Sequence, residues 1–125
     1  MGKSAFRLGI RIPPCRPLRE IADAACTAEA AGFDTISMPD SPMLWRDTVA
    51  ALSLVALRTE RVTVATGIMN IVTRQPTSIA SAARTIAELA PGRFRLGLGA
   101  GDSAVTLTGQ RRAGTTSLPP QWTLP

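Results

Sequence analysis

The chain has 125 residues and 45% of them are hydrophobic, which suits one small folded domain rather than a disordered segment. Fourteen Lys and Arg residues against nine Asp and Glu residues give a net charge of +5, but the arginines are scattered, so a basic nucleic-acid-binding module is only a weak alternative. Because the chain contains no histidine, its sequence excludes histidine general-base chemistry and Ser-His-Asp triads, and it predicts no metal site.

The hydrophobic pattern predicts four strands that alternate with three helices. The expected strands are residues 6–12, 34–38, 62–68 and 93–99. Proline suits the first turn of a helix, so Pro17 and Pro76 open the first and third helices, and Gly32 ends the first. The second helix runs from about Asp47, whose carboxylate can cap it, to Arg58. Pro91 and Gly92 end the third helix.

The spacing of the strands indicates the fold class. Successive expected strands begin about 30 residues apart, the length of one strand, a crossover helix and the return to a parallel neighbour. The runs at 34–38 and 62–68 are apolar, so we expect these strands to be buried on both faces. Such α/β units form an open doubly wound sheet or a TIM-type (β/α) barrel, and a complete barrel needs about 250 residues. A barrel truncated to about four strand-helix units, a half barrel, therefore fits the length.

The helical pattern stops after Ala104. We expect residues 1–104 to be the barrel half and residues 105–125 to be an irregular tail, because the tail is rich in Pro, Thr, Ser and Gly. A shifted reading frame would produce the same abrupt change. The first and last strands would then be open edges that expose unpaired backbone groups and an apolar barrel interior, through which two copies could pair.

The stretch RFRLGLGAGDSAV, residues 93–105, carries three glycines behind an apolar run. Gly99, Gly101 and Ala104 satisfy the G-x-G-x-x-A pattern of dinucleotide-binding loops. That type of site also needs a helix that begins at the loop and an acidic residue about 20 positions later, and the sequence predicts neither. A turn of small residues at the end of a barrel strand is the favoured interpretation.

Two segments resemble a known family. These are GFDTISMPD, residues 32–40, and TGIMNIVTRQPTSIASAARTIAELAPGRFRLGLGAGDSA, residues 66–104. The ordered motifs T-R-x-P, P-G-R-F and L-G-L-G-A-G-D make the chain similar to the luciferase-like monooxygenase superfamily over residues 6–104, and within it to deazaflavin-dependent reductases of the methylenetetrahydromethanopterin reductase type. The resemblance implies a barrel that binds coenzyme F-420 or FMN at the carboxyl ends of its strands. It also implies hydride transfer or oxygen activation by that cofactor on a small organic substrate.

The resemblance also assigns site residues. It places a non-prolyl cis peptide at Gly67–Ile68, and it makes Asp40 and Asn70 candidate catalytic residues. Ser41 stands where many relatives have histidine, which puts acid-base assistance by this loop in doubt. The implied cofactor-binding residues are Asp40, Gly67, Ile68, Met69, Asn70, Gly99, Ala100, Gly101 and Asp102.

Location and alternative functions follow from the remaining features. The N-terminal segment is too short and too charged for a signal peptide, and no apolar stretch approaches the roughly 20 residues that span a bilayer. Cys15 and Cys26 form neither a redox pair nor a metal spacing, so we expect a cytoplasmic protein with two reduced thiols. Three functions remain open: an oxidoreductase that is inactive alone if truncated, a non-catalytic half barrel that self-associates, and the basic nucleic-acid-binding module.

Overall fold

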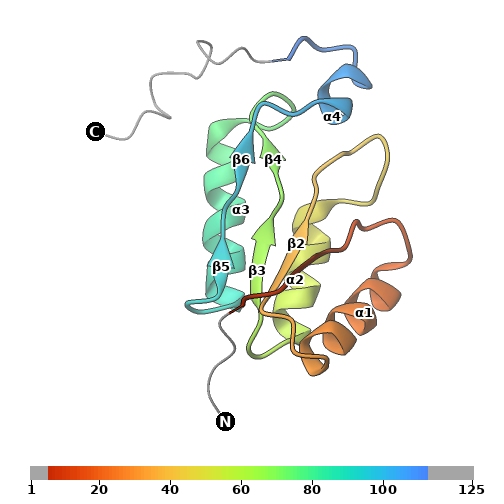
Figure 1. Ribbon diagram of the computed structural model, residues 1–125. Coiled ribbons are helices and arrows are strands. Elements are labelled where there is room, and N and C mark those ends of the chain that lie inside the picture. Colours follow the sequence, from red (N-terminus) through yellow and green to blue (C-terminus); the bar gives the residue numbers. More distant parts are fainter. Residues whose placement is uncertain (1–5, 113–125) are drawn as a thin grey trace.

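Parallel strands and the helices between them follow one another along the chain (Figure 1). The computed structural model describes residues 6–112. The main sheet has the order β1-β2-β3-β5, and all three pairings are parallel. Its strands are β1 Gly9–Arg11, β2 Thr35–Met38, β3 Thr63–Thr66 and β5 Phe94–Arg95. A second parallel pair joins β4 Met69–Asn70 to β6 Leu98–Gly99. The helices are α1 Leu18–Ala30, α2 Thr48–Arg58, α3 Pro76–Leu89 and α4 Ser103–Thr106.

Local signals placed the helix ends correctly. Pro76 is the first residue of α3, where its missing N–H leaves no intrahelical bond unmade. The backbone N–H of Ala50 donates to Asp47 Oδ2 over 2.8 Å, which caps α2 as expected. Gly32 follows α1 with a φ of 93°, a conformation that glycine adopts at little cost.

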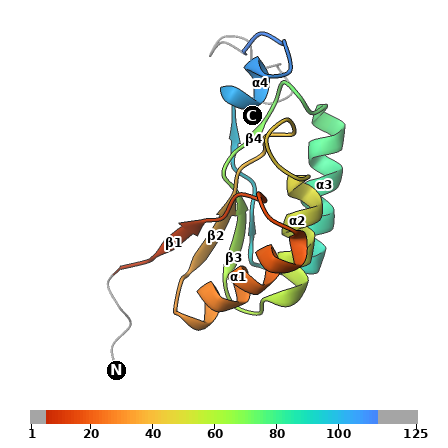
Figure 2. The same cartoon turned by 90° about the vertical axis from the view of Figure 1, so that its right-hand side faces the viewer.

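The core lies between the main sheet and α1, α2 and α3, which all cover the same face of the sheet (Figure 2). Ile36 and Met38 of β2 are fully buried, and Ile36 pairs in register with Val64 of β3. Leu52 of α2 and Ile86 of α3 are fully buried as well. Because burial of one such side chain stabilises the fold by about 1.5–3 kcal/mol, this layer carries most of the hydrophobic stabilisation.

The opposite face of the main sheet is largely polar, and the expectation of burial on both faces was wrong for β2, whereas Val64, Ala65 and Thr66 of β3 are all buried. The aligned row across that face is Arg11, Ser37, Ala65 and Arg95. β2 is not buried on both faces, since Ser37 is only half-buried while Met38 is covered. Nor is the uncovered face apolar, as expected of an exposed barrel interior. Alternate residues of a strand point to opposite faces, and β2 carries its apolar residues only on the side of the helices.

The expected strand 93–99 is interrupted, and the expected strand 62–68 ends at Thr66, with β4 starting only at Met69, which is a second difference. The main sheet and the β4–β6 pair are separated at the level of two residues. These are Thr66, the last residue of β3, and Gly97, which lies between β5 and β6. The Thr66 hydroxyl accepts from the Gly97 N–H and donates to the Gly97 carbonyl, both over 2.8 Å. The Thr66 side chain therefore takes the place of backbone–backbone hydrogen bonds at the point where the sheet divides. A Cβ on residue 97 would overlap the Thr66 carbonyl oxygen, so only glycine fits.

The third difference is α4, a four-residue helix that begins directly after the glycine loop. No helix was expected at that point, and the expected domain boundary at residue 104 falls inside α4. Val105 of α4 is fully buried, so this part of the expected tail packs on the fold. The remainder of the expected tail, residues 113–125, lies outside the described residues. Within residues 6–112 no helix is long and apolar enough to cross a membrane.

Candidate functional site

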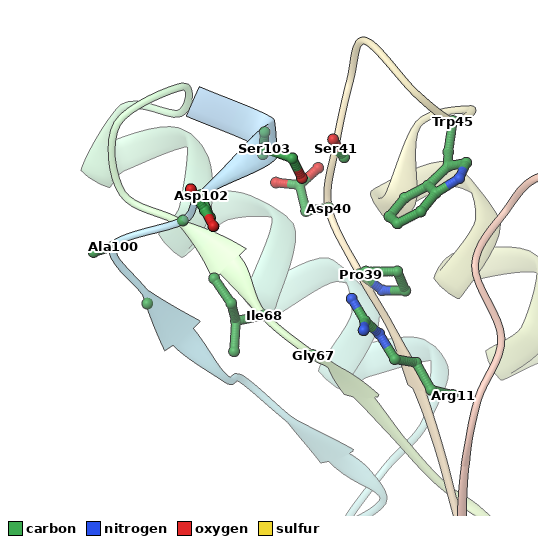
Figure 3. Close-up of a pocket in the computed structure, with 13 residues that line it drawn as sticks. Arg11, Pro39, Asp40, Ser41, Trp45, Gly67, Ile68, Ala100, Asp102 and Ser103 are labelled. Carbon is green, nitrogen blue, oxygen red and sulfur yellow. The ribbon is translucent and has the colours of Figure 1, made fainter. Parts of the chain in front are cut away.

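A cleft of about 450 Å³ opens at the carboxyl ends of the strands (Figure 3). The first two strands contribute Arg11, the last residue of β1, and the residues Pro39–Ser41 and Trp45 of the loop after β2. The end of β3 contributes Gly67 and Ile68, and the opposite side of the cleft is formed by residues 99–104. Seven predicted cofactor-binding residues line it: Asp40, Gly67, Ile68, Gly99, Ala100, Gly101 and Asp102. Met69 and Asn70 do not line the cleft, because both are buried on β4. The parallel order brings these distant segments together, as expected of successive β/α units.

The peptide bond between Gly67 and Ile68 is cis, as the resemblance predicted. The Gly67 N–H donates to the carbonyl of Met38 over 2.8 Å, and the Ile68 carbonyl accepts from the Asp40 N–H over 3.3 Å. Both residues are thereby tied to the end of β2. The Ile68 side chain is 39% exposed and contributes an apolar surface to the cleft.

The glycines of the loop at 99–102 make room for their neighbours. A Cβ on Gly99 would lie 2.8 Å from Ile68 Cδ1, and a Cβ on Gly101 would lie 2.9 Å from Asn70 Cβ. Gly101 also has a φ of 76°, which side chains rarely tolerate. The pattern that resembles a dinucleotide-binding fingerprint therefore serves close packing against β4 and the cis turn.

Asp40 is held by Arg74, the arginine of the T-R-x-P motif, for which the sequence predicted no role in the site. Arg74 Nε donates to Asp40 Oδ2 over 2.8 Å, and its Nη2 donates to Asp40 Oδ1 over 3.1 Å and to Asp47 Oδ1 over 2.9 Å. The Asp40 side chain is only 2% exposed. Hydrogen bonding to Asp40 raises the pKa of the Arg74 guanidinium and outweighs the opposing effect of burial.

This clamp bears on the predicted role of Asp40. Both carboxylate oxygens already accept hydrogen bonds from a fixed cation, so the geometry favours positioning of the loop after β2. Proton transfer by Asp40 stays a prediction. Arg74 and Asp40 are 34 positions apart in the chain, so no short-range sequence pattern predicts that they pair.

Asn70 of β4 supports the site from outside the cleft lining, through hydrogen bonds to the turn that follows it. Its Oδ1 accepts from the backbone N–H groups of Val72 and Thr73 and from the Thr73 hydroxyl, at 3.2, 2.8 and 2.9 Å. These bonds shape the turn that leads to α3. Asn70 Nδ2 is buried without a hydrogen-bond partner among the described residues. Its candidate catalytic role remains a prediction, because the side chain does not line the cleft.

Three polar side chains of the cleft lining were not predicted as binding residues: Arg11, Ser41 and Ser103. Ser41 is 4% exposed, and its hydroxyl has no hydrogen-bond partner among the described residues. Arg11 is exposed at the end of β1 and points into the cleft (Figure 3). The strand pattern could have found Arg11, since it alternates with Ile10, which packs against the core. Trp45, in the loop after β2, also lines the cleft.

A parallel sheet whose helices all cover one face, with a cleft at the carboxyl ends of its strands, is the arrangement of the (β/α)-barrel class. The chain belongs to the luciferase-like monooxygenase family, whose sequence model matches residues 4–118. The 5,10-methylenetetrahydromethanopterin reductase of Methanolobus tindarius is 35% identical over 96 residues, which cover 77% of this chain and 29% of the reductase. A coenzyme F-420-dependent glucose-6-phosphate dehydrogenase of Intrasporangium calvum is 38% identical over 93 residues, covering 68% of this chain and 28% of that enzyme.

Solved structures agree with the sequence relationship. The coenzyme F-420-dependent tetrahydromethanopterin reductase of Methanopyrus kandleri superposes with a TM-score of 0.78 at 29% identity and covers 82% of this chain. The oxygenating constituent of 3,6-diketocamphane monooxygenase from Pseudomonas putida, in complex with FMN, has a TM-score of 0.73 at 23% identity and shows the shared fold. The chain spans 30% and 34% of these two structures, respectively.

Proposed function

We propose that this chain supplies the cofactor-binding strand ends of an oxidoreductase that uses coenzyme F-420 or FMN. The observation that carries the proposal is that Gly67 and Ile68, at the end of β3, line the same cleft as the glycine loop at 99–102. A dehydrogenase and a structurally similar reductase that depend on coenzyme F-420 are among the relatives, which supports this cofactor class. A small organic substrate would complete the reaction.

The residues present fit a flavin-type ring. Ile68, Trp45 and Ala100 offer apolar surface, and the glycines at 99 and 101 keep the backbone free of side chains that would narrow the cleft. When bound, the cofactor supplies hydride transfer or oxygen activation. The chain's residues bind and orient it: Ile68 and the glycine loop by contact, and Asp40 by holding the loop after β2 in place through Arg74.

The test is a titration of the purified chain with coenzyme F-420 and with FMN, followed by absorbance and fluorescence. We expect both the unsubstituted chain and Gly9→Ala to bind one cofactor, since a Cβ on Gly9 meets only ordinary contacts at 3.7 Å. Gly99→Ala forces Ile68 to shift, and we expect about tenfold weaker binding, equivalent to ~1.4 kcal/mol. The proposal fails if neither cofactor binds, or if Gly99→Ala binds as tightly as Gly9→Ala.

We also propose self-association through the sheet edges as a second candidate property. Among the described residues, β1 pairs only with β2 and β5 pairs only with β3, so each leaves one edge unpaired. Unpaired edges are ready templates for another strand. A concentration-dependent mass in light scattering would support self-association, whereas a monomer at every concentration would contradict it.

A cytoplasmic location is the third part of the proposal. Cys15 is exposed and Cys26 is half-buried, and both are free thiols. Free exposed thiols are typical of reducing compartments. Microscopy of a fluorescently tagged chain would test the location, and a signal outside the cytoplasm would contradict it.

A further inference from the structure

Three charged side chains line the cleft, and only one of them lacks a counter-charge. Asp40 pairs with Arg74 through two hydrogen bonds. Asp102 accepts a hydrogen bond from Arg112 over 3.0 Å. Arg11 makes no hydrogen bond or ion pair with any of the residues 6–112. The lining therefore carries one uncompensated positive charge.

The backbone fixes where this charge lies. Arg11 pairs in register with Ser37, and the N–H of the following residue, Ile12, donates to the Ser37 carbonyl over 2.9 Å. Since Ile10 packs against the core under the helices, the Arg11 side chain extends from the opposite face of the sheet. Its neighbour in the row, Ser37, is small and leaves the guanidinium free to reach a ligand. Figure 3 shows Arg11 directed toward Pro39 and the interior of the cleft.

The rest of the cleft restricts what can occupy it. Trp45, Ile68 and Ala100 present apolar surface within the same 450 Å³. A ligand that complements both the apolar lining and the charge of Arg11 therefore has an apolar or planar body and a negatively charged group. A guanidinium binds carboxylates and phosphates through paired hydrogen bonds, which neutral groups match less well.

We propose that Arg11 binds a phosphate or carboxylate group of the molecule that occupies the cleft. The inference rests on the proposed function and deepens it, because the anionic group belongs either to the cofactor or to the second substrate. Arg11 is then a binding residue that selects for an anionic ligand.

The experiment compares Arg11→Gln with Arg95→Gln. Arg95 lies in the same row of the same sheet face, is exposed, and does not line the cleft, so its substitution removes an equal charge elsewhere. Binding of inorganic phosphate is measured by ³¹P NMR at constant ionic strength, after urea unfolding has shown that both variants are folded. We expect Arg11→Gln to weaken phosphate binding at least about fivefold and Arg95→Gln to leave it unchanged. Equal phosphate binding by the two variants, or none by the unsubstituted chain, overturns the inference.

FMN and riboflavin, which differ by one phosphate, identify the source of the anionic group. If Arg11→Gln weakens FMN binding but not riboflavin binding, the group belongs to the cofactor. If it weakens only the binding of inorganic phosphate, the group belongs to the second substrate. Failure of the unsubstituted chain to bind FMN or coenzyme F-420 would refute the proposed function, while the phosphate measurement would still decide the role of Arg11.

Discussion

Glu29, near the end of α1, shows how one side chain can organise a connection far along the chain. Its carboxylate accepts hydrogen bonds from the backbone N–H groups of Glu60, Arg61 and Val62, the shortest at 2.7 Å. Partial burial acts to raise the pKa of Glu29, but these three backbone donors outweigh it and hold the pKa below its ordinary value of 4.5. The ionised form of Glu29 therefore stabilises the segment that leads into β3.

The lowered pKa of Glu29 predicts a pH dependence of stability. The unfolded chain takes up a proton at Glu29 more readily than the folded chain does, so this contribution is complete above about pH 4.5 and is lost as the pH falls further. We expect Glu29→Gln to lower the urea midpoint at pH 7 and to have a smaller effect at pH 3. Glu88→Gln, at an exposed position of α3, is the matched control. An equal loss at both pH values would contradict the prediction.

At the scale of elements, Arg93 completes the carboxyl end of α2. Its Nη2 donates to the carbonyls of Ala56 and Thr59 at 3.1 and 3.0 Å, and its Nη1 donates to the carbonyl of Val62 at 2.8 Å. Carbonyls at the end of a helix have no partner within the helix. The arginine of the P-G-R-F motif thus joins α2 to the start of β5.

Loss of this cap should destabilise the fold. We expect Arg93→Met to lower the free energy of unfolding by about 2–3 kcal/mol, because several partly buried carbonyls lose a charged donor. Arg84→Met removes an exposed arginine of α3 and should change stability by less than about 0.5 kcal/mol. Urea unfolding of both variants checks this, and similar values for the two would refute the capping role.

Thr66 controls the division of the sheet. Replacing it with valine keeps the shape of the side chain but removes both hydrogen bonds to Gly97, and we expect a loss of about 1–2 kcal/mol. Thr66→Ser keeps the hydroxyl and should cost less than Thr66→Val. Thermal and urea unfolding measure the difference, and a serine variant less stable than the valine variant would show that packing, not hydrogen bonding, governs this position.

At the scale of the whole molecule, Arg74 joins three segments around the cleft. It lies before α3 and pairs with Asp40 after β2 and with Asp47 at the start of α2. Removal of Arg74 would leave the Asp40 carboxylate buried without its cation. A buried charge without a partner is far more costly than a missing surface ion pair.

A double-mutant cycle tests this connection. We expect Arg74→Met to lower the free energy of unfolding by roughly 3 kcal/mol, and the further change Asp40→Asn to recover part of the loss. Arg74→Lys should fall between the parent and Arg74→Met, since an ammonium cannot reproduce the two-point contact with Asp40. Urea unfolding gives all the values, and strictly additive effects of the two substitutions would rule out the coupling.

The sequence by itself determined the order of strands and helices, the cap at Asp47, the start of α3 at Pro76 and most of the residues that line the cleft. These features depend on local patterns or on motifs: capping groups lie within one turn of their targets, and strand ends of successive β/α units converge on one side. The tertiary structure alone decided the clamp between Arg74 and Asp40, the cap by Arg93, the division of the sheet at Gly97 and the burial of Asn70 beneath the glycine loop. Their partners lie about 30 positions apart in the chain, and only packing of the folded chain sets which distant polar groups meet.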